Sequence, residues 1–257
     1  MRRWRLTDAD WNSWPGGLTD AQTLDQAAGL GLAGIELGVY DAAVELAPAR
    51  LAALAAGPVP VTAVLLSLPA DDWSDGALAG DVERLHGQVQ ASSQACRDLG
   101  LPVLGLWPGA DEVGADVLYG LQRCVATAGD VRIALEYKPD TAVEDATQAM
   151  ALCDEVEGLG VLLDTGHAFA AGEDPAEVVG LLGDRLLHVH LGDAGGGGGD
   201  DDLPCGRLHD FGPFLTALDR TGYAGTASFD LYGAVSAGGI SSLEAVRESV
   251  EHLRSRR

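Results

Sequence analysis

A single lysine, Lys138, stands in the segment ALEYKPD at 134–140, and the other 15 of the 16 basic residues in the chain are arginines. An arginine guanidinium stays charged in proteins, whereas a lysine ammonium is a compact point charge whose pKa shifts readily on burial. On a strand, Glu136 would share a face with Lys138, because residues two apart point the same way. Lys138 and Glu136 are therefore candidate catalytic residues. A chance surface lysine is the alternative when position 138 is considered alone.

Polar residues end four successive apolar segments in the second half of the chain. These residues are Glu136, Asp164, His190 and Asp230. Three carboxylates around one site would repel one another strongly unless a cation neutralised them. Carboxylates combined with one imidazole suit Mn²⁺, Mg²⁺ or Co²⁺ better than a thiolate-binding metal. We therefore predict that these four residues bind a divalent metal, with Mn²⁺ as the expected ion.

Two further histidines lie close to this set in the sequence. His167 follows Asp164 by one short turn, and His188 precedes His190 by two residues. Because His190 lies nearer the exit of its strand, we predict that it is the metal ligand. His188 is then expected to pack in the interior or to support the ligand from behind.

Apolar segments alternate with helical segments along the whole chain. Strands are expected at 34–38, 59–67, 101–109, 131–139, 159–167, 185–193 and 225–233, with residues 2–6 as an eighth. Helices are expected at 19–31, 41–56, 77–99, 111–128, 141–157, 174–183, 210–222 and 242–255. Such alternation indicates a parallel sheet covered by helices. We predict an α/β fold in one domain over 1–257, a (β/α)8 TIM barrel, with a doubly wound open sheet as the alternative. In such a barrel the active site lies at the carboxyl ends of the strands.

Composition narrows the classes of partner. A net charge of −23 and a pI near 4.3 disfavour nucleic acid and anionic membranes, which would be repelled. No apolar run reaches the roughly 18 residues of a membrane span, and no charged-then-apolar leader opens the sequence. The four cysteines are scattered without a CxxC pair. We therefore expect reduced thiols in a cytoplasmic protein.

The order of the four predicted ligands, with gaps of 28, 26 and 40 residues, resembles the xylose isomerase-like TIM barrels. This superfamily includes sugar isomerases and epimerases, inosose-processing enzymes and the endonuclease IV group. The resemblance extends over nearly the whole chain. It includes the segments GLAGIELG, LLDTGHA, HVHLGD and LPCGRLHDFGPFL, of which the last is similar to a Pro-Gly-x-Gly stretch.

Two features are similar to the isomerase branch of that superfamily. The Glu-x-Lys-Pro motif at Glu136 resembles that of xylose and L-rhamnose isomerases, which implies that Lys138 touches the carbonyl-end oxygen of the substrate. The last acid is Asp230, as in that branch, whereas the 3-epimerases and inosose enzymes carry a second glutamate there. The arginine that often follows the strand-seven aspartate in epimerases is missing after Asp193. Its loss disfavours a phosphorylated substrate.

The DTGH segment resembles the rhamnose isomerase pattern, in which the histidine helps to hold a second, catalytic metal. The resemblance implies that His167 does so with Glu136 and two aspartates after the seventh strand. Asp200, Asp201 and Asp202 are the candidates, although their spacing departs from the pattern. Whether a second metal binds stays open at this point.

Two tryptophans, Trp14 and Trp107, fall where the first and fourth strands should end. Aromatic rings stack on the apolar faces of sugars, so both are candidate substrate-binding residues, together with His167. Packing at the barrel rim is the alternative for each.

These observations together predict a metal-dependent aldose–ketose isomerase acting on a non-phosphorylated sugar. Lys138 would polarise the carbonyl oxygen as negative charge develops, and His167 would bind the second metal or donate to the substrate. The alternatives are a keto-sugar 3-epimerase, an inosose-type isomerase or dehydratase, a lyase or deglycosylase, and a non-catalytic sugar-binding regulatory barrel. The sequence names neither the sugar nor the oligomeric state, so a homo-oligomer stays open.

Overall fold

Eight parallel strands close into a barrel in chain order. The computed structural model describes residues 4–67, 82–107, 115–195 and 201–256. The strands are β1 (Arg5–Ala9), β2 (Ile35–Val39), β3 (Val61–Leu66), β4 (Val103–Leu106), β5 (Arg132–Glu136), β6 (Gly160–Asp164), β7 (Leu186–Leu191) and β8 (Thr226–Phe229). Strand β8 pairs with β1, with Ala227 opposite Leu6, and this pairing closes the sheet. The predicted (β/α)8 TIM barrel is confirmed, and the open sheet is excluded.

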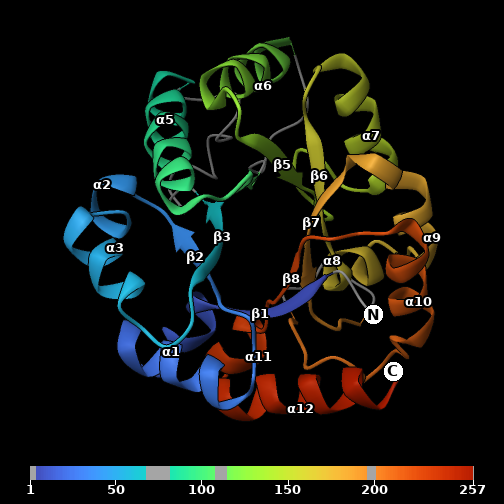
Figure 1. Cartoon of the computed structure of the whole chain (residues 1–257). Coiled ribbons are helices and arrows are strands. Elements are labelled where there is room, and N and C mark those ends of the chain that lie inside the picture. Colours follow the sequence, from blue (N-terminus) through green and yellow to red (C-terminus); the bar gives the residue numbers. More distant parts are fainter. Residues whose placement is uncertain (1–3, 68–81, 108–114, 196–200, 257) are drawn as a thin grey trace.

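Helices surround the barrel and cover the outer face of its strands (Figure 1). The longer ones are α1 (Asp20–Gly29), α3 (Pro48–Ala55), α5 (Val82–Leu99), α6 (Ala115–Ala128), α7 (Ala146–Glu155), α9 (Pro175–Leu182), α10 (Gly212–Thr221) and α12 (Ser242–Ser255). The shorter ones are η1 (Asp10–Ser13), α2 (Ala42–Glu45), α8 (Thr165–Ala170), η2 (Gly183–Arg185) and α11 (Tyr232–Ser236). Among the residues described, no helix has the length and apolar character needed to cross a membrane.

Several predicted elements differ from the observed ones. The strand predicted at 131–139 ends at Glu136, so Lys138 lies beyond it, and the strand predicted at 225–233 ends at Phe229. The helix predicted at 41–56 is split into α2 and α3, because Pro48 has no amide hydrogen to continue a helix but suits the first turn of a new one. The first strand runs over Arg5–Ala9 rather than 2–6. The strand predicted at 159–167 ends at Asp164, and His167 lies on α8 instead.

The strands are buried on both faces. Every residue of β2 and of β6 is buried, which explains why both are mostly apolar without an alternating pattern, with Glu36 and Asp164 as the charged exceptions. The outer faces pack against the helices in one large core. A small separate cluster, which includes Trp11 and Leu162, packs on the other side of the sheet. Each polar side chain within these strands is therefore an exception that needs a partner.

The turn after β1 is fixed to the last strand by Asn12. Its side-chain amide donates to Asp8 Oδ1 at 2.9 Å and to the carbonyl of Phe229 at 2.7 Å, and its Oδ1 accepts from the backbone of Leu231 at 2.8 Å. Asp10 accepts from the backbone of Gly38 at 2.9 Å and from Arg50 at 3.0 Å. The 3-10 helix η1 is therefore held between β8 and β2.

The carboxyl of Asp8 is fully buried, and its Oδ2 has no hydrogen-bond partner in the described part of the chain. Burial raises the pKa of Asp8 to about 7, while the hydrogen bond from Asn12 acts in the lowering direction. A carboxyl whose pKa is higher in the folded state stabilises that state while protonated. This contribution is complete below the unfolded pKa and is lost as the pH rises through about 7.

We expect the free energy of unfolding of Asp8→Asn, relative to that of the wild type, to rise by about 2 kcal/mol between pH 5 and pH 8. The amide keeps the oxygen that accepts from Asn12 but cannot ionise, so only the wild type incurs the cost of a buried charge. Urea unfolding of both proteins at the two pH values measures the change. A difference that does not vary with pH would contradict the assignment.

Candidate metal centre and cavity

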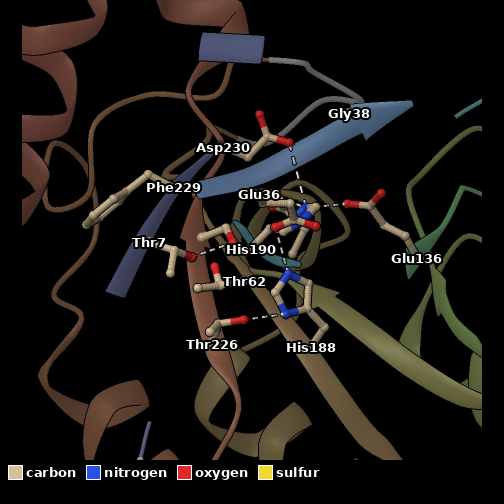
Figure 2. Close-up of polar contacts among 12 residues, drawn as sticks. Thr7, Glu36, Gly38, Thr62, Glu136, His188, His190, Thr226, Phe229 and Asp230 are labelled. Atoms are coloured by element: carbon tan, nitrogen blue, oxygen red, sulfur yellow. Dashed lines mark hydrogen bonds and ion pairs between the residues drawn. The ribbon is translucent and has the colours of Figure 1, made fainter. Parts of the chain in front are cut away.

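Four side chains from neighbouring strands converge at the carboxyl ends of β5 to β8. They are Glu136, Asp164, His190 and Asp230, and each places one ligand atom within 4.8 Å of the others. Glu136 and Asp164 are the last residues of β5 and β6, His190 is paired with Asp164 across β6 and β7, and Asp230 follows β8. The convergence of Glu136, His190 and Asp230 is visible in Figure 2. The structure therefore brings the four predicted ligands together.

The imidazole of His190 lies at the centre of the three carboxylates. Its Nδ1 is 3.0 Å from Glu136 Oε1, 3.8 Å from Asp164 Oδ2 and 3.7 Å from Asp230 Oδ2. The side chain of His190 is completely buried, and Asp164 Oδ2 is a buried oxygen with no hydrogen-bond partner in the described residues. An unpartnered buried carboxylate oxygen beside two more carboxylates needs a positive charge. Three oxygen donors and one nitrogen donor fit a divalent cation.

Asp230 is engaged on both of its oxygens. The indole of Trp11 donates to Oδ1 at 2.8 Å, while Oδ2 faces His190. Burial raises the pKa of Asp230 to about 6, with His190 acting in the lowering direction and Asp164 in the raising direction. The ring of Trp11 also packs edge-on against His190, with 5.6 Å between the centroids. Trp11 therefore orients the fourth predicted ligand.

A cavity of about 680 Å³ opens above this group. The predicted site residues that line it are Trp14, Trp107, Glu136, Lys138, His167 and Asp230, and Trp11, Tyr40, Asp202 and Tyr232 also contribute. The ammonium of Lys138 lies 5.2 Å from the centroid of the Trp107 ring, within the range of a cation–π contact. Trp14 packs against Tyr40, with 5.5 Å between the centroids. The cavity thus combines aromatic walls with a charged floor.

The imidazole of His167 is oriented by the backbone. Its Nδ1 is 3.0 Å from the carbonyl oxygen of Tyr137, and because a carbonyl only accepts, Nδ1 carries the hydrogen. The opposite nitrogen of a neutral ring is then an acceptor or a ligand atom. Since His167 lines the cavity, it can accept from a hydroxyl there, whereas it can donate only when protonated.

The segment after β7 contributes one carboxylate to the cavity. Asp193 and Leu203 form an antiparallel bridge, and next to it Asp202 lines the cavity while accepting from the backbone of Gly233 at 2.8 Å. Burial raises the pKa of Asp202 well above its usual range, and the charges of Asp230 and Asp164 act in the same direction. Asp201 is exposed and accepts from Gly195 at 3.1 Å. Asp200 lies outside the described residues.

Sequence reasoning missed Glu36, which is the second residue of β2. Its Oε2 is 2.7 Å from Nε2 of His188 and 3.2 Å from Nε2 of His190, whereas Glu136 and Asp230 face Nδ1 of the His190 ring (Figure 2). His188 is not one of the four converging side chains, which agrees with its predicted supporting position. A signal was present in the sequence, because a glutamate interrupts the apolar segment GIELG of a strand that had to be buried.

Comparison with known proteins identifies the family of this chain. A family model described as Xylose isomerase-like TIM barrel matches residues 24–256. An inosose dehydratase of Lacticaseibacillus casei is 28% identical over an aligned stretch of 130 residues, which covers 41% of this chain and 43% of that protein. The chain therefore matches less than half the length of this relative.

Two solved structures illustrate the similarity of the fold. D-allulose 3-epimerase from Methylomonas sp. superposes with a TM-score of 0.78 at 20% identity, over 100% of this chain and 99% of that one. The IolI protein, solved with a bound zinc atom, superposes with a TM-score of 0.73 at 17% identity, over 98% of this chain and 97% of that one. At these identities the likeness establishes the fold alone.

Proposed function

Because the chain belongs to the xylose isomerase-like TIM barrel family, we propose that it is a divalent-metal-dependent enzyme that interconverts an aldose and a ketose. The observation that carries the proposal is the convergence of Glu136, Asp164, His190 and Asp230 beneath the cavity. Mn²⁺ is the expected ion, with Mg²⁺ and Co²⁺ as alternatives. A cation held by these residues would supply Lewis-acid chemistry, polarising adjacent oxygens of an open-chain sugar.

The charges of the cavity favour a substrate without phosphate. Among the described residues that line it, Lys138 is the only lysine or arginine, whereas Glu136, Asp202 and Asp230 are carboxylates. A phosphate would therefore face more negative than positive side chains. The aromatic walls suit the apolar faces of a sugar.

The two strand-end carboxylates that flank the cavity differ in their availability as bases. Asp230 is engaged by Trp11 on one oxygen and faces His190 with the other. Glu136 faces His190 with Oε1, and its side chain lines the cavity. One available carboxylate can take a proton from a carbon and return it to the next carbon on the same face of the sugar. That chemistry is an aldose–ketose isomerisation.

The side chains of Lys138 and His167 complete the proposed mechanism. The ammonium of Lys138 would stabilise the negative charge that develops on the carbonyl oxygen. The contact between Lys138 and the Trp107 ring supports a fixed position for this ammonium over the cavity. His167 would accept from a substrate hydroxyl, because its Nδ1 hydrogen is engaged by the carbonyl of Tyr137.

A 3-epimerase or inosose-type enzyme is the second candidate. It is supported by the likeness of the fold to D-allulose 3-epimerase and by the partial match to an inosose dehydratase. Inversion at one carbon needs a base and an acid on opposite faces of the substrate. Asp202, which also lines the cavity, would then have to supply the second group.

The products formed from a panel of free aldoses and ketoses test the proposed reaction. With Mn²⁺ present, we expect at least one aldose–ketose pair to be interconverted in both directions, as followed by ¹³C NMR. Asp164→Asn provides the inactive control, since it removes a predicted ligand without touching Glu136 or Lys138. Inversion at C3 of a ketose, or loss of water from an inosose, without aldose formation would overturn the isomerase assignment in favour of the second candidate.

Metal removal tests the proposed metal site directly. We expect protein purified without chelator to contain a divalent ion bound by the four residues, and EDTA to lower its melting temperature. A ligand that binds only the folded state stabilises it by about 2.7 kcal/mol at a concentration of 100 Kd. Asp164→Asn should abolish the response to Mn²⁺, whereas Asp201→Asn, an exposed acid, should retain it. A wild-type melting temperature that changes with neither EDTA nor Mn²⁺ would contradict the proposed metal site.

Substitution of Lys138 tests its role in the reaction. Loss of one preorganised donor at a developing oxyanion typically costs about 10²–10³ in rate, so Lys138→Met should lower kcat by that factor and raise KM less. Lys138→Arg should fail nearly as badly, because a planar guanidinium cannot occupy the place of an ammonium. Metal content, the internal control, should be unchanged in both variants. Near-normal isomerisation by Lys138→Arg would refute this role of Lys138.

A further inference from the structure

We propose that Glu36 is a positioning residue that holds His190 from behind, fixes which of its nitrogens carries the hydrogen, and thereby sets the affinity of the site for metal. The inference rests on the metal site of the proposed function but not on which sugar reaction takes place there. Glu36 belongs to β2, which is not adjacent to β7 in the barrel order. Its carboxylate therefore reaches His190 across the barrel interior.

The two nitrogens of His190 face different groups. Nδ1 faces the three converging carboxylates, the nearest being Glu136 Oε1 at 3.0 Å, while Nε2 lies 3.2 Å from Glu36 Oε2. A nitrogen that binds a metal cannot carry a hydrogen, so in the metal-bound protein the hydrogen of a neutral ring must be on Nε2. Nε2 makes no well-aligned hydrogen bond with the described residues, and Glu36 Oε2 lies close enough to accept one. Glu36 is therefore the acceptor for that hydrogen.

Glu36 is itself held by a second histidine. Nε2 of His188 is 2.7 Å from the same oxygen, Oε2, and Nδ1 of His188 is 3.3 Å from the hydroxyl of Thr226 (Figure 2). The rings of His188 and His190 are nearly perpendicular, with 5.2 Å between their centroids. His188 thus places Oε2 where it meets the edge of the His190 ring.

Burying this carboxylate costs free energy. Its presence therefore indicates a role that a neutral residue could not fill. Glu36, His188 and His190 are each less than 5% exposed, and Glu36 Oε1 has no hydrogen-bond partner in the described part of the chain. A charge removed from water is destabilising unless it is fully compensated. A carboxylate behind a metal-binding histidine raises the basicity of the ligand nitrogen and fixes the orientation of the ring. Orienting His190 in this way accounts for a charged residue at position 36.

The test compares Mn²⁺ binding by metal-free wild type, Glu36→Gln and Asp8→Asn, measured by titration calorimetry. Glutamine keeps the size of the side chain but loses its charge. We expect Glu36→Gln to bind Mn²⁺ about 10- to 100-fold more weakly, the usual effect of losing such a partner. Asp8→Asn is the matched control, because it also neutralises a fully buried strand carboxylate but has no contact with His190 among the described interactions. Its affinity should equal that of the wild type.

A spectroscopic readout separates positioning from a structural role. In the zinc-loaded wild type, ¹⁵N NMR of the histidine rings should place the hydrogen of His190 on Nε2, and Glu36→Gln should shift this proton resonance. If Glu36→Gln does not fold, Glu36→Asp replaces it, because the shorter side chain keeps the charge but withdraws the oxygen from His190. It should likewise bind Mn²⁺ more weakly.

Three outcomes would overturn the inference. Wild-type Mn²⁺ affinity in a folded Glu36→Gln or Glu36→Asp would remove the inference and leave the proposed function intact. Absence of metal binding by the wild type would remove both. A second ion bound by Glu36, His188 and His190, whose ligand atoms also lie within 4.8 Å of one another, would show that Nε2 of His190 carries metal rather than hydrogen.

Discussion

Repulsion among three carboxylates around one buried imidazole is the constraint on which the candidate site depends. Glu136, Asp164 and Asp230 each point an oxygen at Nδ1 of His190, at distances between 3.0 and 3.8 Å. A low-dielectric interior strengthens this repulsion, so the arrangement demands a positive charge at its centre. The cavity, with its aromatic walls and Lys138, lies next to this group of charges. A polar centre of this kind can persist only where the surrounding structure holds every donor in place.

The barrel supplies this rigidity through parallel strands that end at one rim. Strand pairing fixes their register: Asp164 is paired with His190, and Glu136 is paired with Leu162, two residues before Asp164. Behind them the interior is otherwise apolar, and the exceptions are bonded to one another, as Glu36 is to His188. The site thus has two layers. The side chains of the outer layer line the cavity, and those of the inner layer contact only other side chains. Chemistry at the rim therefore depends on residues well below it.

The sequence predicted the outer layer of this arrangement better than the inner one. Alternating apolar and helical segments predicted the barrel, and polar residues at strand ends predicted the four converging side chains, because both depend on local pattern. The local pattern marked Glu36 only as a glutamate in an apolar strand, and its contact with His188 could not be predicted because the two residues are 152 positions apart. Trp11 was missed for the same reason, as its indole meets Asp230 across 219 residues. The break at Pro48 was readable from its chemistry, yet its alanine-rich surroundings favoured a single helix.

The hydrogen bonds of Asn12 join the turn after the first strand to the end of the last strand. This side chain contacts Phe229 and Leu231, so Trp11, one residue before it, acquires its final place only after the last strand has joined the first. Contacts of such sequence separation form late, because a long loop must close before they contribute. On the ribosome, which releases the N-terminal side first, the first strand must therefore wait until residues 226–231 have been synthesised. A nascent or truncated chain lacking residues 229–231 would contain Glu136, Asp164 and His190, but not the wall that completes their cavity.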